Sequence, residues 1–326
     1  MHPKLTSRAL SEGALMATLA ALLALIGMYL PPLRLVTDVI WTIPIVVLII
    51  RHDLKTGAIS LTVAALLVMM LSDPIQAGFL VLQFGSIGLL YGISLKRNVL
   101  PGKIILGGSL VAVAAQLVIF FLLSRATGFS LVGFEEGMKA QVAPTIQLYE
   151  RLGLTSHYAN QGISEKMLRD SMLEMIRWMK LLLPGMLITA SVVAALFNYL
   201  VVVIVLRKLR FPVKPLPPFR EWQLPWYCAW GVIVGLGLLL GGDYYRWAVA
   251  GAAGKNILLI YSPFLFVFGL SVATYFYKTW KLPGIAKAII VVLAIMNIPL
   301  AVMVVTSLGL FDSLLNYRRL ASRNSQ

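Results

Sequence analysis

The chain has 326 residues, of which 59% are hydrophobic and only 13% are charged. Soluble domains carry about 45–50% apolar and about 25% charged residues, so this composition excludes a cytosolic enzyme, a disulfide-rich secreted scaffold and a disordered chain. The formal net charge is +15, but the basic residues stand between long apolar runs. That placement is typical of membrane orientation and not of nucleic-acid binding. We therefore expect the chain to lie in a lipid bilayer and to have no nucleic-acid partner.

Apolar stretches recur along the whole chain at the length that a membrane span requires, which is about 20 residues. Nine stretches approach it: 9–30, 35–50, 57–71, 75–95, 104–123, 181–206, 225–240, 256–277 and 283–308. The second, third and seventh are short, so eight crossings is the alternative count. The first stretch runs into two prolines without a small-residue cleavage site, so we expect a retained span and not a signal peptide. The sequence predicts an all-α, polytopic transmembrane helix bundle of about eight or nine spans, with an amphipathic helical insert.

Basic residues in the loops predict the orientation, because Lys and Arg concentrate on the cytoplasmic side. With the N-terminus in the cytoplasm, the cytoplasmic segments hold fifteen basic residues, and the short outside loops hold only Arg34, Arg246 and Lys255. The tail arginines at positions 318, 319 and 323 would lie outside if all nine stretches cross. Either one short stretch does not cross, or the tail departs from the rule.

Two polar segments divide the chain into predicted domains. Residues 1–206 form a six-span domain, in which residues 124–180 are an outside insert with two amphipathic helical patterns. This insert lies on the membrane surface or caps the bundle; the alternative is a solvated linker. The second pattern begins at Ser164, a plausible N-cap, and continues as one helix to residue 206 with a kink at Pro184. Residues 207–225 hold five prolines and form an extended cytoplasmic linker, and residues 226–326 form a C-terminal membrane domain of two or three spans with a basic tail.

The inventory of reactive residues is poor. The single cysteine, Cys228, and three scattered histidines form no metal-ligand motif, and no Gly-rich phosphate loop is present. No charged residue lies near the centre of any span, so a proton relay lacks its usual groups. We therefore expect no catalytic residue, no metal and no cofactor, and an enzyme acting on lipid-linked substrates is the least favoured reading.

Neutral polar residues inside the spans are the remaining candidates for function. Gln83, Gln116, Asn198 and Asn297 can each line a binding cavity or form an interhelical hydrogen bond. The first outside loop adds Arg34, Asp38 and Trp41, and together with Gln116 these three form our predicted ligand site. The alternative is that Arg34 pairs with Asp38 across one helical turn and that Trp41 is an interfacial anchor.

The first span carries a face of small residues. These are Gly13, Ala17, Ala20, Ala21 and Ala24, which recur at helical spacing. Such faces let two helices approach closely. We expect a helix-contact surface here, either with another span of the same chain or with a separate membrane subunit.

Three stretches of the C-terminal half resemble the YybS-like family of bacterial multi-spanning membrane proteins, which is defined by a domain of unknown function. They are residues 216–225 (LPPFREWQLP), 255–277 (KNILLIYSPFLFVFGLSVATYFY) and 308–319 (LGLFDSLLNYRR). The resemblance covers nearly the whole chain. It implies a location in the bacterial cytoplasmic membrane and supplies no catalytic residues.

Residues 8–206 are also similar to the substrate-binding S components of energy-coupling factor transporters. The similarity rests on the alanine-rich first span, the short second span from Trp41 to Pro44, the basic turn RHDLKTG (51–57) and GLLYG (88–92). It implies that the small-residue face contacts a membrane coupling subunit. The function favoured by the sequence is a transporter-like substrate-binding component that depends on partner subunits for energy and binds a small molecule. The alternative is a non-catalytic membrane scaffold or cell-envelope assembly factor.

Overall fold

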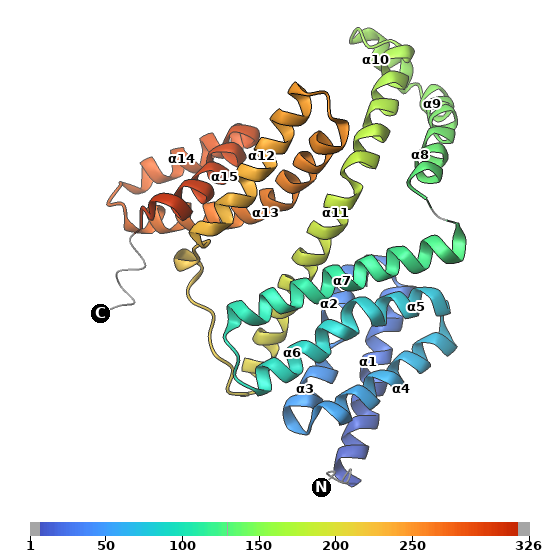
Figure 1. Cartoon of the computed structure of the whole chain (residues 1–326), viewed down its shortest axis with the longest axis vertical. Coiled ribbons are helices and arrows are strands. Elements are labelled where there is room, and N and C mark those ends of the chain that lie inside the picture. Colours follow the sequence, from blue (N-terminus) through green and yellow to red (C-terminus); the bar gives the residue numbers. More distant parts are fainter. Residues whose placement is uncertain (1–6, 129, 319–326) are drawn as a thin grey trace. The chain divides into compact units, whose positions relative to one another are not determined.

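The structure, a computed structural model, describes residues 7–128 and 130–318. Within these ranges the chain forms helices and no strand, and nine helical segments are long and apolar enough to cross a membrane. The predicted all-α polytopic class is confirmed (Figure 1). The chain divides into two compact units: unit 1 is Met1–Phe129 with Ala190–Leu216, and unit 2 is Ser130–Thr189 with Pro217–Gln326. Residues 130–180 of the predicted insert therefore group with the C-terminal region, whereas the sequence placed the insert in the first domain.

Unit 1 contains the first five spans and the second half of the sixth. Its helices are α1 (Ser7–Tyr29), η1 (Pro31–Leu33), α2 (Arg34–Ile40), α3 (Ile43–Arg51), α4 (Leu54–Leu71), α5 (Pro74–Leu80), the π-helical turn η2 (Val81–Gly85), α6 (Ser86–Lys96), α7 (Pro101–Thr127) and the end of α11 (Glu165–Lys208). Aspartates begin two of these spans. Asp53 accepts a hydrogen bond from the Thr56 N–H at 2.7 Å, and Asp73 accepts one from the Gln76 N–H at 2.8 Å. Each side chain satisfies a backbone donor that the first helical turn leaves free.

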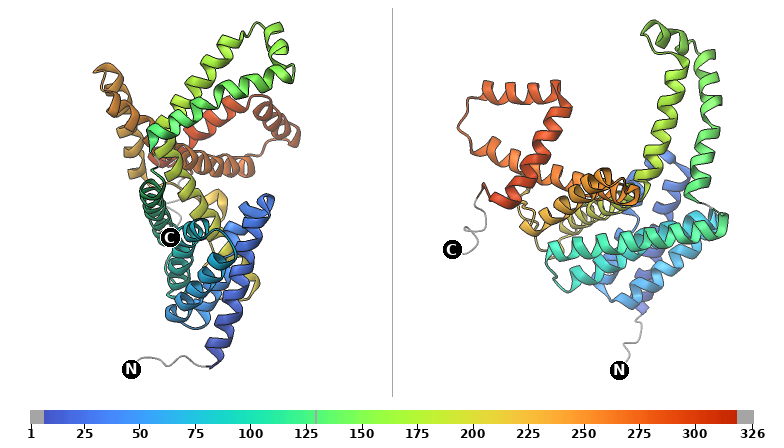
Figure 2. Two further views of the ribbon diagram at one scale, coloured as in Figure 1. Left: turned by 90° about the vertical axis from the view of Figure 1, so that its right-hand side faces the viewer. Right: turned by 45° about the horizontal axis from the view of Figure 1, so that its top comes forward.

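The insert between the fifth and sixth predicted spans folds back along the first half of α11, as the green helices of Figure 2 show. It consists of α8 (Leu131–Ala140), α9 (Val142–Arg151) and α10 (Leu154–Asn160). Val142 and Ile146 pack against Ile176 of α11 in a small apolar core. The two predicted stripes thus meet only in part, because the contact on α11 is centred on Ile176, whereas Met175 of the second predicted stripe is exposed. Glu135 adds ion pairs of 2.6 Å each to Lys139 and Lys180.

The predicted continuous helix is confirmed, because α11 runs unbroken from Glu165 to Lys208. Its start is also as predicted, since the Ser164 hydroxyl accepts a hydrogen bond from the Met167 N–H at 3.2 Å. Next to Pro184, the side chain of Asn256 on α13 bonds to the α11 backbone. Asn256 accepts from the Gly185 N–H at 2.7 Å and donates to the Leu181 carbonyl at 2.9 Å. The Asn256 side chain therefore bonds to a backbone N–H and a backbone carbonyl that bond to each other in an ordinary helix.

The C-terminal part of unit 2 contains η3 (Phe219–Glu221), η4 (Trp226–Cys228), α12 (Ala229–Tyr244), α13 (Ala248–Thr279), α14 (Gly284–Met296) and α15 (Ile298–Leu315). Helices α12 and α13 form an antiparallel pair (Figure 1). Helix α15 packs on α13 with direct backbone approach, since a side chain at Gly269 would overlap the carbonyl of Val305. Glycine is required there because any Cβ would separate the two helices.

The ninth predicted span, 283–308, is wrong as a single helix. The chain turns between α14 and α15 at Asn297, and Figure 2 shows the corner. Pro299 lacks a backbone N–H and cannot continue the hydrogen-bond ladder of α14. The side chain of Asn297 caps the new helix by accepting from the Leu300 N–H at 3.2 Å. Asn297 is therefore a helix cap, whereas the sequence considered it for a cavity or an interhelical bond.

Candidate functional site

The second span is interrupted in the middle of unit 1. Helix α2 ends at Ile40 and α3 begins at Ile43, with Trp41 and Thr42 in a turn between them. Pro44 occupies the first turn of α3, where a missing N–H is tolerated. Asn198 of α11 bonds to this break, donating to the Val39 carbonyl at 2.8 Å and to the Thr42 hydroxyl at 3.3 Å. Exposed backbone at membrane depth is tolerated only inside protein or beside a cavity, and Asn198 supplies one of the partners required.

The fourth span is also irregular, because the π-helical turn η2 separates α5 from α6. Gln83 lies in this turn and is buried. Single π-helical turns in helices occur frequently at functional sites. Phe84 of the same turn packs against the apolar cluster that contains Trp41 and against the cluster that contains Tyr199. Phe84 therefore connects the two apolar clusters of unit 1.

Four buried polar atoms of these two spans and of α11 have no hydrogen-bond partner. They are Trp41 Nε1, Gln83 Oε1, Asn198 Oδ1 and the Tyr199 hydroxyl, among seven such atoms in the described part of the chain. An unpaired buried group costs about 1–3 kcal/mol, so native proteins supply partners for nearly all of them. We call these four residues the interrupted-helix site. The neighbouring Tyr91 differs, because its hydroxyl donates to the Ala195 carbonyl at 2.7 Å.

The chemistry of the interrupted-helix site is neutral. The indole of Trp41 can only donate, the free amide oxygens can only accept, and the Tyr199 hydroxyl can do either. No acidic or basic side chain belongs to the site, and its surroundings are apolar. Among the described residues no three His, Cys, Asp or Glu side chains gather as metal ligands. Groups of this chemistry match a small uncharged molecule that carries both donors and acceptors.

The predicted ligand residues do not form one group. Arg34 and Asp38 pair across one turn of α2 at 3.7 Å, as the alternative interpretation expected, and the Arg34 side chain is 55% exposed. Trp41 is fully buried in the core, so it is not an interfacial anchor. Gln116 is half-buried on α7, and no described hydrogen bond connects it to the other three. Only Trp41 of the predicted set belongs to the interrupted-helix site.

The small-residue face of α1 is covered by helices of the same chain. Gly13, Ala17, Ala20, Ala21 and Ala24 are all buried. Helices α2, α3 and α4 pack on α1, and a side chain at Gly27 would overlap Thr37 of α2. A cavity of about 160 Å³ remains between α1 and α4, beside Gly13. In this chain the face thus contacts other helices of unit 1.

Comparison with known proteins defines the family. The family described as "Predicted membrane protein (DUF2232)" matches residues 18–313. The chain belongs to this family. It is also 25% identical over 311 residues to the Bacillus subtilis (strain 168) protein described as "Uncharacterized protein YybS", and the match covers 94% of this chain and 96% of that protein. No solved structure matches. The resemblance to the YybS-like family is confirmed, whereas these matches do not show the similarity to S components.

The three stretches that carry the resemblance to the DUF2232 family meet around one buried ion pair in unit 2. Arg318 and Asp312 bond at 2.7 Å, and both side chains are almost completely buried. The Arg318 guanidinium also donates to the Arg220 carbonyl at 2.7 Å, to the Trp222 carbonyl at 2.8 Å and to the Ser271 hydroxyl at 2.9 Å. We call Arg318, Asp312 and Ser271 the C-terminal clamp. It fixes the end of the Pro-rich segment to α13 and α15.

The C-terminal clamp changes the interpretation of the tail charges. Arg318 is an internal ion-pair partner, whereas the sequence counted it as a free tail arginine. The other two tail arginines, at 319 and 323, lie outside the described residues. Because Arg318 touches residues 220 and 222, the end of α15 lies beside the end of the Pro-rich segment.

Proposed function

We propose that this membrane protein is the substrate-binding component of a transporter, and that it holds a small, uncharged, polar molecule at the interrupted-helix site. The observation that carries the proposal is the set of four buried, unpaired polar atoms beside two interrupted spans. Transporters commonly bind substrates near the bilayer midplane where helices are discontinuous, because the freed polar groups there face the ligand. A purely structural core would pair such groups or replace them with apolar side chains.

The energy for transport comes from partner subunits under this proposal. The sequence contains no Gly-rich phosphate loop, and we propose that the chain itself is not an enzyme. A partner does not dock on the small-residue face of α1, because α4 covers it. The opposite face of α1 carries the exposed Leu15, Leu19 and Leu22 and is available to a partner or to lipid.

We also propose that the protein lies in the bacterial cytoplasmic membrane with its N-terminus, Pro-rich segment and C-terminal end in the cytoplasm. The charge asymmetry of the loops supports this orientation. The C-terminal clamp supports the same side for the Pro-rich segment and the end of α15. In a Cys228→Ser background, an impermeant thiol reagent should label Tyr158→Cys and not Lys214→Cys in intact cells. The reverse pattern contradicts the orientation.

Native mass spectrometry of the full chain, purified from its host membrane, tests the function. We expect a small-molecule adduct on the wild-type protein, no adduct on Gln83→Leu, and an unchanged adduct on the control Gln116→Leu. The control removes an amide of the same type from a span outside the site. Retention of the adduct by Gln83→Leu, or absence of any adduct from the wild type, contradicts the proposal and favours the scaffold alternative.

A further inference from the structure

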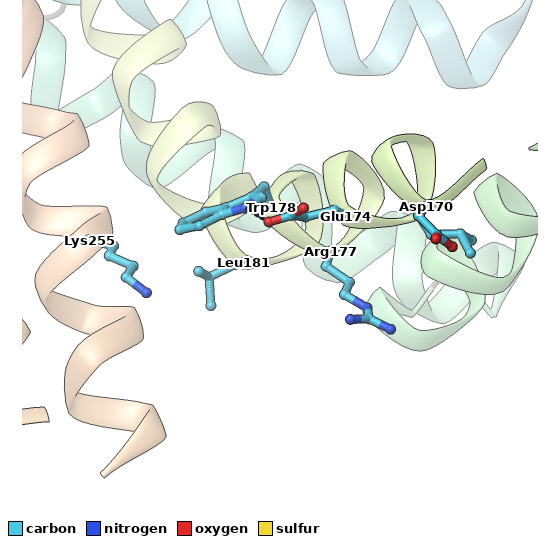
Figure 3. A pocket seen from close by; sticks show the side chains of 7 residues that line it. Asp170, Glu174, Arg177, Trp178, Leu181 and Lys255 are labelled. Carbon is cyan, nitrogen blue, oxygen red and sulfur yellow. Dashed lines mark hydrogen bonds between the residues drawn. The ribbon is translucent and has the colours of Figure 1, made fainter. Parts of the chain in front are cut away.

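A pocket of about 510 Å³ lies between α11 and α13 in unit 2 (Figure 3). Its lining consists of Asp170, Leu173, Glu174, Arg177, Trp178, Leu181 and Lys255. We call it the α11–α13 pocket. Its chemistry is unlike that of the interrupted-helix site, because charges of both signs line it together with a tryptophan.

The charged side chains of the pocket are not paired with one another. In the described part of the chain no ion pair involves Asp170, Glu174, Arg177 or Lys255. The Lys255 ammonium instead lies over the Trp178 ring, 4.9 Å from its centre, and the Trp178 indole donates weakly to Glu174 at 3.5 Å. Figure 3 shows Lys255 facing α11 from the other helix. The pocket thus presents two cations and two anions that are available to a ligand.

The sequences of the two helices indicate the level of the pocket relative to the membrane. Helix α11 is rich in charge up to Lys180 and apolar from Leu181 onward, so it changes from polar to apolar at the level of the pocket. On α13 the polar pair Lys255 and Asn256 lies at this level, between two apolar stretches. This level is where lipid headgroups lie, and tryptophan and lysine are typical residues there.

The charges are ordered along the axis of α11. Asp170 and Glu174 lie farthest from the apolar part, Arg177 and Trp178 follow, and Leu181 comes last. At 1.5 Å per residue, Glu174 and Arg177 are about 4.5 Å apart along the axis, and Asp170 and Leu181 about 16 Å apart. Lys255 shares the level of Trp178, because it stacks on that ring. Anions therefore lie outermost, cations lie below them, and apolar side chains face the membrane core.

From this order we propose that the α11–α13 pocket binds the phosphoethanolamine headgroup of a membrane phospholipid. Arg177 and Lys255 hold the phosphate through charge-assisted hydrogen bonds, and Asp170 and Glu174 receive the outermost ammonium. The glycerol and acyl chains continue along Leu181. Simple attraction between the basic chain and lipid would favour an anionic headgroup instead, so the two explanations predict opposite lipid preferences.

The experiment uses the full chain in nanodiscs that contain equal amounts of phosphatidylethanolamine and phosphatidylglycerol with identical acyl chains. Lipids that remain bound after mild release into detergent are counted by native mass spectrometry. We expect about a tenfold preference for phosphatidylethanolamine in the wild type, the size that one charge-assisted hydrogen bond provides. Inorganic phosphate added at millimolar concentration should not displace the lipid, because it lacks the ammonium and the apolar part.

Matched variants assign the effect to the pocket. Arg177→Gln with Lys255→Gln should lose both lipids, whereas Asp170→Asn with Glu174→Gln should reverse the preference toward phosphatidylglycerol. The control, Lys166→Gln with Arg169→Gln, removes two positive charges from the same helix outside the pocket and should behave as wild type. A wild type that prefers phosphatidylglycerol or neither lipid, displacement by phosphate, or equal loss in the control overturns the proposal. The lipid preference is a ratio within one sample of folded protein, so it does not depend on the yield of a variant, and the loss of both lipids is measured per folded protein against the control variant.

Discussion

Substituting Gln83→Leu should stabilise the empty protein while abolishing ligand binding. The Gln83 side chain is only 8% exposed, and its Oε1 has no hydrogen-bond partner. Leucine has a similar volume and no polar atom, so the substitution removes an unsatisfied acceptor that costs about 1–3 kcal/mol. We expect the free energy of unfolding of the empty protein to rise by about 1 kcal/mol, since part of the gain is offset by imperfect packing. When a residue serves binding and costs stability, replacing it raises the stability of the protein and lowers its affinity for the ligand.

The assay is thermal unfolding in detergent, measured on protein that has been stripped of small molecules and then on protein as first purified. Wild type should gain stability from its co-purified ligand, and Gln83→Leu should not. Asn198→Leu serves as the structural contrast, because it removes the bonds to Val39 and Thr42 and should lower stability in both preparations. If Gln83→Leu destabilises the stripped protein as Asn198→Leu does, Gln83 is an ordinary core residue and the reasoning is refuted.

Three further substitutions test the packing of the two units. Arg318→Ala leaves Asp312 buried without its partner and should lower the free energy of unfolding by about 3–5 kcal/mol. The double variant Arg318→Met with Asp312→Leu should lose far less stability. An equal loss in the double variant would show that the unpaired charge is not the cause. Ala17→Leu with Ala21→Leu adds bulk to the buried face of α1 and should cost about 1–3 kcal/mol per site in a thermal-unfolding measurement, whereas an unchanged melting temperature would contradict the close packing. Hydrogen bonds from two lysines hold the pKa of Glu135 at about 2, below its ordinary 4.5. The stability that these ion pairs contribute is therefore complete above pH 4.5 and is lost as the pH falls toward 2. Spin-label distances between α8 and α11 should therefore lengthen only in that acidic range, and Glu135→Gln should show the longer distance at neutral pH; a wild-type distance that does not change with pH would contradict this.

Much of the fold could be predicted because membrane spans depend on local composition. The length of the apolar stretches predicted the all-α class. Ser164 as a helix N-cap, followed by a helical pattern without a break, predicted the long helix α11. Asn297 shows the limit of that reasoning. Residues 283–308 hold one charged residue, Lys287, in a mainly apolar stretch, so hydropathy counts one span, whereas a capping side chain and Pro299 divide it in two. Arg318 shows the same limit, because its carbonyl partners come from a segment about 100 residues away and no local pattern reveals them.

The candidate site was only partly visible in the sequence. Gln83 and Asn198 stand out as polar residues in apolar spans, but the sequence does not show whether an amide is paired. Trp41 was grouped with Arg34 and Asp38 because they are neighbours in the chain, although the break before α3 turns Trp41 into the core and leaves Arg34 exposed. Pro44 was the one signal of that break. The π-helical turn at Gln83 leaves no signature in composition, and Tyr199 resembles any other aromatic residue of a span.

An experimental map of the full chain in a lipid nanodisc, prepared without stripping, tests most directly whether the interrupted-helix site holds a ligand. We expect density for one non-protein molecule within hydrogen-bond distance of Trp41 Nε1 and of at least one of the free amide oxygens of Gln83 and Asn198. If those atoms bond instead to other protein groups or to single waters, with no larger molecule between the two interrupted spans, the site holds no ligand.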